Sequence, residues 1–134
     1  MPIITLSTTL AMASAAAIIN IWLAVRIGAV RRAYKVSVGH GGNEAVERRM
    51  RAQLNFVEYT SFVLILIALI ELSGRGGLWL NVVGGVYMLG RVAHGVGMDG
   101  TGPLAVGRMV GTLTSMLITL GLAIAAALIA ARVI

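Results

Sequence analysis

Four long apolar segments follow one another along the chain, separated by short polar or glycine-rich stretches. A hydrophobic helix of about 20 residues is enough to cross the apolar layer of a bilayer. We therefore predict four membrane-spanning helices, over about residues 3–32, 44–73, 76–98 and 104–131. The connections between them contain the turn-forming sequences GHGG at 39–42, LSGRGG at 72–77 and DGTGP at 99–103.

The second predicted helix differs from the others because its uncharged part is short. Only the 12 residues from Tyr59 to Ile70 are free of charge, which is too few to cross a bilayer alone. The helix must therefore begin well before Tyr59 and carry polar residues to membrane depth. Asn43 is a suitable N-terminal cap for it, with Glu44 and Glu47 in its first turns.

The composition supports a membrane location and argues against several kinds of chemistry. Hydrophobic residues make up 58% of the 134-residue chain, against about 45–50% in soluble proteins, and only 12% of residues are charged. We expect one all-α domain over 1–134, an integral membrane four-helix bundle. The chain has no cysteine and only two histidines, His40 and His94, so disulfides, thiol nucleophiles and metal centres are not expected.

The basic residues are concentrated at one end of the predicted bundle. Seven of the 11 Lys and Arg residues lie between Arg26 and Arg51, and Arg91 and Arg108 flank the other connection at that end. Because cytoplasmic connections carry an excess of Lys and Arg, we place this end in the cytoplasm and both termini on the opposite side. The net charge of +6 favours anionic lipid or a small anion as a partner, rather than nucleic acid.

A line of polar residues runs along the start of the second helix, in the sequence VERRMRAQLNFVEYTSF at 46–62. At about 100° per residue, Asn55 lies roughly 40° to one side of Arg51 and Glu58 roughly 20° to the other. Ionisable side chains inside a bilayer face a protein interior or a water-filled cavity rather than lipid. This stripe therefore predicts a polar site within the membrane.

The other predicted helices carry polar groups at the same depth, namely Arg31 and Arg32, Arg91 and His94, and Arg108. Arginine binds carboxylates through two parallel hydrogen bonds, and Glu58 would accept an ammonium group. The cluster therefore predicts a site for a small ligand that carries both carboxylates and an ammonium group.

A structural interpretation of the same residues is also open. Glu58 would then form a buried ion pair with Arg51 or Arg91 that fixes the helix register. Asn20 and Asn81 are interpreted as interhelical hydrogen-bonding groups. Small residues at 84–85, 107–111 and 121 favour close helix packing, either within one subunit or between subunits.

The run VERRMRAQLNFVEY resembles the signature E-R-x-x-R-A-x-x-N-x-x-E-[YT] of the membrane-associated proteins in eicosanoid and glutathione metabolism, the MAPEG superfamily. The similarity extends to RRAYKVS after the first helix, GRVAHGVG at the end of the third and an arginine early in the fourth. The chain is most similar to the small bacterial members, which implies a multi-pass bacterial inner-membrane protein. The resemblance also implies a homotrimer of four-helix subunits that binds glutathione between neighbours near the cytosolic side.

The same resemblance implies roles for individual residues. Arg108 takes the position of the arginine that holds the glutathione sulfur as a thiolate, and it is the expected catalytic residue. A nearby guanidinium favours the thiolate, and glutathione would supply the sulfur that this cysteine-free chain lacks. The residues matched to glutathione binding are Arg31, Arg32, Arg51, Gln53, Asn55, Glu58, Tyr59, Arg91 and His94.

Three positions depart from the pattern of the animal enzymes. Met98 and Thr112 stand where tyrosines occur, and Met109 stands where prostaglandin E synthase has a serine after the catalytic arginine. We therefore expect glutathione transfer to lipophilic electrophiles, or peroxide reduction, rather than a specific eicosanoid synthesis. A non-catalytic binding protein with this fold is the alternative. A small multidrug transporter fits less well, because the first helix has no acidic residue and the charge bias is strong.

Overall fold

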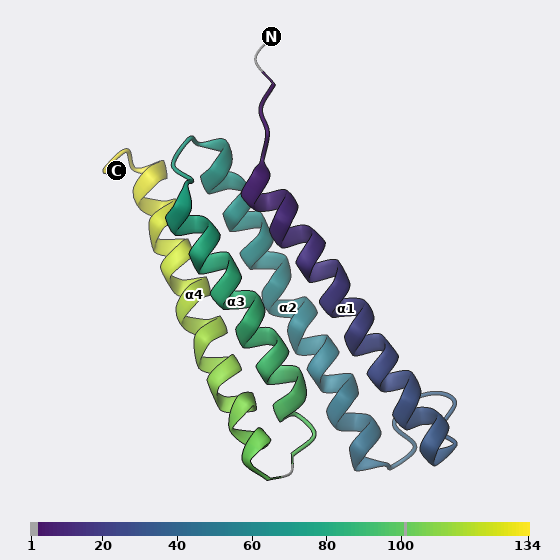
Figure 1. Ribbon diagram of the computed structural model, residues 1–134. Helices are drawn as coiled ribbons and strands as arrows, with labels where there is room; N and C mark the ends of the chain where they lie inside the picture. The colour runs from purple at the N-terminus through teal and green to yellow at the C-terminus, as the bar shows by residue number, and fades with distance from the viewer. Residues whose placement is uncertain (1–2, 101) are drawn as a thin grey trace.

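The computed structural model describes residues 3–100 and 102–134. Its helices are α1 (Ser7–Tyr34), α2 (Glu44–Leu72), α3 (Leu78–Gly97) and α4 (Val106–Ala130), with a short 3-10 helix, η1 (Pro103–Ala105), before α4. Both termini lie at one end of the bundle, and the α1–α2 and α3–α4 connections lie at the other (Figure 1). The predicted all-α fold is confirmed, with every helix boundary within a few residues of its predicted position. The predicted 99–103 turn includes Thr101, which lies outside the described residues.

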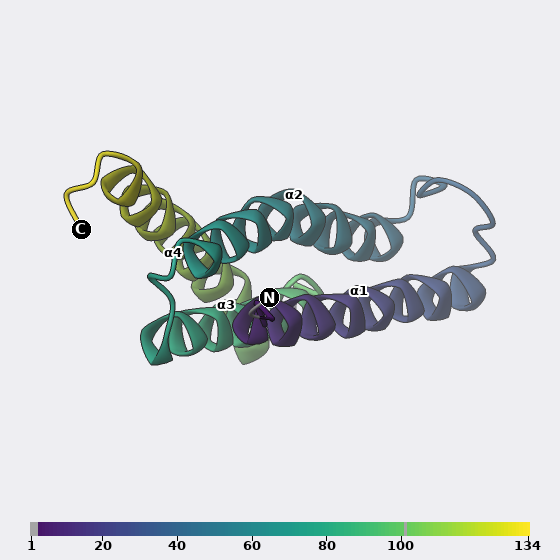
Figure 2. The ribbon, with the colours of Figure 1, turned by 90° about the horizontal axis from the view of Figure 1, so that it is seen from above.

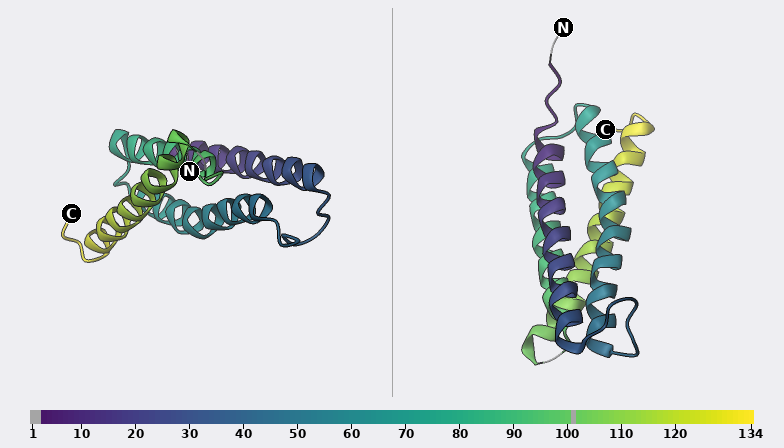
Figure 3. Two further views of the ribbon diagram at one scale, coloured as in Figure 1. Left: turned by 90° about the horizontal axis from the view of Figure 1, so that it is seen from below. Right: turned by 90° about the vertical axis from the view of Figure 1, so that its right-hand side faces the viewer.

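The third helix, α3, packs against each of the other three helices. α1 packs on α2 and α3, and α4 packs on the same two helices. In the described part of the chain, α1 and α4 do not pack against each other. Seen along the bundle, α4 runs at an angle to the other helices and its C-terminal end lies far from α1 (Figures 2 and 3). Any coupling between α1 and α4 must therefore pass through α2, α3 or a connecting segment.

Glycine residues allow α3 and α4 to approach closely near the connection between them. A methyl group on Gly111 would lie 2.5 Å from both the carbonyl oxygen of Gly90 and the Cβ of His94. Gly107 also faces the α3 backbone directly, whereas Gly121 has open space around its Cα. The small residues at 107–111 therefore serve packing within one chain, which was one of the two interpretations that the sequence left open.

The first helix begins at Ser7, later than the predicted residue 3, because its cap comes from another helix. The carboxylate of Glu71, near the end of α2, accepts hydrogen bonds from the backbone N–H groups of Thr8 and Thr9, both at 2.8 Å. A carboxylate there satisfies amides that have no partner within the helix and complements its dipole. Thr8 also donates its hydroxyl to Asn81 of α3 at 3.1 Å, so Asn81 is an interhelical group as predicted.

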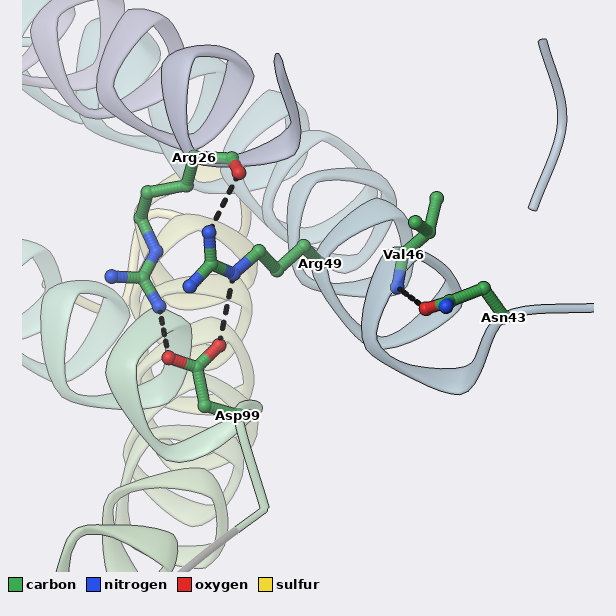
Figure 4. A network of polar contacts seen from close by, with 5 residues as sticks. All are labelled: Arg26, Asn43, Val46, Arg49 and Asp99. Carbon is green, nitrogen blue, oxygen red and sulfur yellow. Dashed lines mark hydrogen bonds and ion pairs between the residues drawn. The ribbon is translucent and has the colours of Figure 1, made fainter. Parts of the chain in front are cut away.

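The second helix begins where the sequence predicts. Asn43 is its cap, and the side-chain oxygen accepts a hydrogen bond from the Val46 backbone N–H at 3.1 Å (Figure 4). Further along, the Gln53 side chain donates to Asn20 of α1 at 3.2 Å, which confirms the interhelical role predicted for Asn20. The polar start of α2 is therefore anchored to both its own first turn and α1.

Three helical segments are long and apolar enough to cross a membrane, namely α1, α2 and Pro103–Ala130. α3 is not among them, because its 20 residues include Asn81, Arg91 and His94. Many large apolar side chains of the bundle point outward, as expected for helices whose outer faces contact lipid. The chain is therefore a membrane protein, while the crossing of the membrane by α3 and the cytoplasmic location of the basic end stay predictions.

Candidate functional site

Arg91 lies inside the bundle and links three helices. The residue is 1% exposed, and its guanidinium donates to Asn55 of α2 at 2.6 Å and to Ser115 of α4 at 2.9 Å. It forms no ion pair within the described residues, and its Nε has no hydrogen-bond partner there. The rings of Phe56 and Tyr59 lie 6.0 and 5.8 Å from the guanidinium carbon. Neutral oxygens and aromatic faces therefore surround this buried charge.

The bond to Arg91 determines what Asn55 can offer to a ligand. Arginine carries only N–H donors, so Asn55 must present its side-chain oxygen to Arg91 and keep its NH₂ group for another partner. Because Asn55 is only half-buried, that NH₂ group is suited to a carboxylate or carbonyl oxygen and not to an ammonium group. His94, which is 3% exposed, lies beside Arg91 with its Nδ1 3.4 Å from the guanidinium. Arg91 and His94 are thus placed in the bundle interior, where Arg91 fixes the orientation of the Asn55 side chain.

The other two residues of the polar stripe, Arg51 and Glu58, lie on the outer surface of α2. The Arg51 side chain is 72% exposed and pairs with Glu47, one turn earlier, at 3.5 Å. Glu58 is also exposed, and it forms no hydrogen bond or ion pair with any other described side chain. The structural interpretation, an ion pair between Glu58 and Arg51 or Arg91, is therefore not what a single chain forms.

The chain has five acidic residues, and Glu58 differs from the other four in its contacts. The other four have partners: Glu44 pairs with Arg48, Glu47 with Arg51, Asp99 with Arg26 and Arg49, and Glu71 with the amides of Thr8 and Thr9. The Glu58 carboxylate is thus the acidic group left for a ligand or for a second chain.

A groove between α1 and α2 brings together three of the predicted residues. It has a volume of about 500 Å³, and its polar lining includes Arg31, Arg51 and Gln53, together with Glu47, the ion-pair partner of Arg51. His40, from the α1–α2 connection, also lines the groove and was not predicted. Its apolar lining consists of Ile27, Met50, Leu54 and Val57. The groove therefore suits a ligand that has both an anionic and an apolar part.

Arg108 lies apart from this groove. It is exposed in the first turn of α4, where it lines an open hollow of about 460 Å³ together with Met109 and Thr112. The Thr112 hydroxyl donates to the Arg108 carbonyl oxygen at 2.8 Å, so this donor is already in use. Arg32 is exposed at the end of α1. Neither guanidinium has a side-chain partner among the described residues.

A single chain therefore does not bring the predicted site residues together. Asn55, Tyr59, Arg91 and His94 lie in or at the edge of the bundle interior, and Arg31, Arg51 and Gln53 line the α1–α2 groove. Glu58 and Arg108 lie on the outer sides of α2 and α4, and Arg32 lies at the end of α1. A charged side chain on the outside of a membrane helix requires water or another protein surface. No three His, Cys, Asp or Glu side chains in the described ranges lie close enough to hold a metal ion.

Comparison with known proteins gives the family. The model of the MAPEG family matches residues 9–128, which is nearly the whole chain. The chain belongs to the MAPEG family. It is also similar to the inner membrane protein YecN of Escherichia coli strain K12 and to the protein of that name in Escherichia coli O6:H1, with 29% identity over 65 residues in each case. The aligned part is 48% of this chain and 50% of each relative, so the chain spans about half the length of the curated relatives it matches.

Besides His40, the sequence did not predict the contacts of two further residues of this MAPEG chain. Ser115 holds the Arg91 guanidinium, and it follows Gly107 and Gly111 at intervals of four residues, on the stripe of α4 that faces α3. That spacing was a usable signal. Asp99 bridges α1 and α2, but its partners are distant in sequence and gave no signal.

Proposed function

We propose that this MAPEG protein is a glutathione-dependent membrane transferase or peroxidase that works as a homotrimer, with glutathione bound between subunits. The observation that carries the proposal is Glu58, an exposed carboxylate without a partner among residues 3–100 and 102–134, on the same stripe of α2 as Arg51 and Asn55. Glutathione has an ammonium group for Glu58, and carboxylates for Arg51 and for the Asn55 NH₂ group. The MAPEG family includes glutathione transferases, and membership supports the proposal.

A ring of subunits would complete the site. In a cyclic oligomer, one surface of each chain meets a different surface of the next. Arg108 on α4 of one subunit would then approach the groove that holds Arg31 and Arg51 in its neighbour. The resulting contact would cover exposed charges that a single chain leaves at membrane depth.

The chemistry would come from the glutathione sulfur. A guanidinium such as Arg108 beside the thiol favours its ionised, nucleophilic form. The thiolate would form a carbon–sulfur bond with a lipophilic electrophile that enters from the bilayer. It would either displace a leaving group, which departs with its bonding electron pair, or add to an activated double bond, whose other carbon then takes up a proton. With a hydroperoxide it would instead break the O–O bond, and a second glutathione would complete the disulfide and leave an alcohol and water.

One observation favours a non-catalytic binding protein as the second candidate. Met109 and Thr112, next to Arg108, offer no free hydrogen-bond donor toward a thiol, since the Thr112 hydroxyl is bonded to the Arg108 carbonyl. Such a protein would bind glutathione without ionising its sulfur.

Titration of the detergent-purified protein with glutathione tests both candidates, with calorimetry for binding and ultraviolet absorbance for thiolate at neutral pH. We expect saturable binding with thiolate formation. Arg108→Ala should abolish the thiolate, whereas Arg132→Ala, an exposed arginine at the opposite end, should keep it. Binding without thiolate in the unaltered protein would favour the non-catalytic candidate, and no binding would refute glutathione as the ligand.

Glu58 is tested in the same titration. Glu58→Gln should weaken glutathione binding about 10-fold or more, because a charge-assisted hydrogen bond contributes about 1.5–3 kcal/mol. Glu44→Gln is the matched control, since Glu44 pairs only with Arg48 of its own helix. Equal affinities for the two variants would remove Glu58 from the site.

A further inference from the structure

Asp99 connects three parts of the chain that are far apart in sequence. It lies just beyond α3, in the connection to α4, and its carboxylate accepts hydrogen bonds from Arg26 of α1 at 2.7 Å and from Arg49 of α2 at 3.2 Å (Figure 4). Arg49 also donates to the backbone carbonyl of Arg26 at 2.8 Å. We call these three residues the Asp99 clamp.

The Asp99 clamp is more constrained than an ordinary surface ion pair. The side chains of Arg26 and Arg49 are only 21% and 24% exposed. The Arg26 guanidinium also lies over the Trp22 ring, 5.0 Å from its centre, and Trp22 packs against Gly95 of α3. Ion pairs between fully exposed, flexible side chains contribute little, but here both arginines are held by further contacts.

The electrostatics keep the clamp formed at neutral pH. Partial burial by itself raises the pKa of Asp99, but the hydrogen bonds from Arg49 and Arg26 outweigh it and hold the pKa below its ordinary value of 3.8. The carboxylate is therefore ionised throughout the neutral range, and both bonds are charge-assisted.

The end of α3 packs directly against the start of α4. Gly97 packs against the backbone of Arg108 so closely that a methyl group on Gly97 would overlap it. Movement at the end of α3 is therefore transmitted to Arg108. α1 does not pack on α4, and the α1–α2 side of the bundle carries Arg31, Arg51 and Glu58. Asp99 is thus a second polar link between the two sides, beyond the bonds of Arg91 to Asn55 and Ser115, and it includes α1.

We propose that Asp99 is a positioning residue, which fixes the start of α4, and with it Arg108, relative to the α1–α2 side that carries Arg51 and Glu58. The inference rests on the proposed function for its chemical consequence, because it assigns Asp99 to the placement of the residue that would ionise the thiol. In a ring of subunits, each clamp would set the angle at which Arg108 is presented to the neighbouring groove. Small displacements matter there, since a misplacement of about 1 Å can lower a rate about 100-fold.

The position of the start of α4 relative to α1 can be measured as a distance between two labels. The chain has no cysteine, so Val25→Cys on α1 and Leu104→Cys on η1, both at exposed positions, allow two spin labels to be attached selectively. Dilution with excess unlabelled protein restricts the reading to distances within one subunit. Double electron–electron resonance should give a broader or longer distance distribution for Asp99→Asn, and Asp99→Glu should largely restore the original one.

Glu44→Gln is the matched control, because it removes an acid at the same end whose only ion pair lies within α2. Its distance distribution should equal that of the unaltered protein. If Asp99→Asn does not fold, as judged by circular dichroism and size exclusion, Arg26→Gln breaks the α1 side of the clamp alone and should give the same broadening. An unchanged distribution in the folded variant would overturn the inference.

The chemical consequence is read separately. Asp99→Asn should lower the amount of thiolate formed from bound glutathione, because the Arg108 guanidinium would no longer be held beside the thiol, while glutathione affinity changes much less. Asp99→Glu should restore the thiolate. A displaced α4 with unchanged thiolate would refute the positioning role. If the unaltered protein binds no glutathione, the proposed function fails, and the distance measurement still decides whether Asp99 fixes α4.

Discussion

A single methyl group on α4 tests the contact that joins α3 to α4. In Gly111→Ala, the new Cβ would lie 2.5 Å from the Gly90 carbonyl oxygen and 2.5 Å from the His94 Cβ, whereas ordinary contact begins at 3.4 Å. Neither atom is the end of a flexible side chain. The two helices must therefore move apart to accept the methyl group, or the backbone must distort.

The size of the effect follows from two opposing contributions. Overpacking of a well-filled contact costs about 1–3 kcal/mol. Alanine is also a better helix former than glycine, by about 1 kcal/mol. Gly121→Ala is the matched control, because it lies in the same helix and its Cβ meets nothing within 4 Å. The propensity gain is common to both variants and cancels, so they should differ by the overpacking cost, which is about 5-fold to 150-fold in the unfolding equilibrium.

Reversible unfolding of the detergent-solubilised protein by sodium dodecyl sulfate, followed by circular dichroism, measures this difference. Gly111→Ala should unfold at a lower denaturant fraction than the unaltered protein, and Gly121→Ala at an equal or higher one. Equal stability of the two variants would show that α3 and α4 do not meet at Gly111. The packing that connects Gly97 to Arg108 would then also lose its support.

Two further predictions follow from the same structure. Ser115→Ala removes the acceptor of a hydrogen bond from buried Arg91, so it should lower the free energy of unfolding by about 1.5–3 kcal/mol. The control is Ser61→Ala, because the Ser61 hydroxyl donates to the Val57 carbonyl of its own helix at an exposed position. This substitution should change the free energy of unfolding by less than about 0.5 kcal/mol. A Ser115 variant as stable as the Ser61 variant would contradict the assigned bond. Because the folded-state pKa of Asp99 lies below 3.8, its carboxylate stabilises the fold above that pH and loses the effect as the pH falls further. The stability difference between the unaltered protein and Asp99→Asn should therefore be constant near neutrality and shrink in acid, and a difference that grows in acid would refute the assignment.

The helices were predictable because their signals are local. Apolar length, the glycine turns and the Asn43 cap all lie within the segments that they define, and the structure reproduces them. The start of α1 was placed too early because its cap is not local. The Glu71 carboxylate accepts hydrogen bonds from the first amides of α1, although it is more than 60 residues away in the sequence, and the residues around Ser7 do not predict that contact.

The shared stripe of α2 was predictable from the sequence, whereas the arrangement of the candidate site residues in space was not. The i, i+4, i+7 spacing of Arg51, Asn55 and Glu58 correctly gives a shared stripe, since it depends only on helix geometry. It does not give the direction in which Arg91 points. Arg91 turns inward because Asn55 and Ser115, on two other helices, offer oxygens at 2.6 and 2.9 Å.

Because Arg91 points inward, the charged side chains of the candidate site fall into two groups, one buried and one exposed. Arg91 is fully buried, and within the described part of the chain its positive charge meets dipoles and aromatic faces but no carboxylate. Arg51, Glu58 and Arg108 are exposed on helices that are predicted to cross the membrane. A membrane helix tolerates the first kind through internal hydrogen bonds, but it tolerates the second only if protein, water or a polar ligand replaces lipid. The single chain thus leaves the proposed site incomplete, and in our proposal its exposed charges mark the surfaces at which a second subunit and an ionic ligand meet.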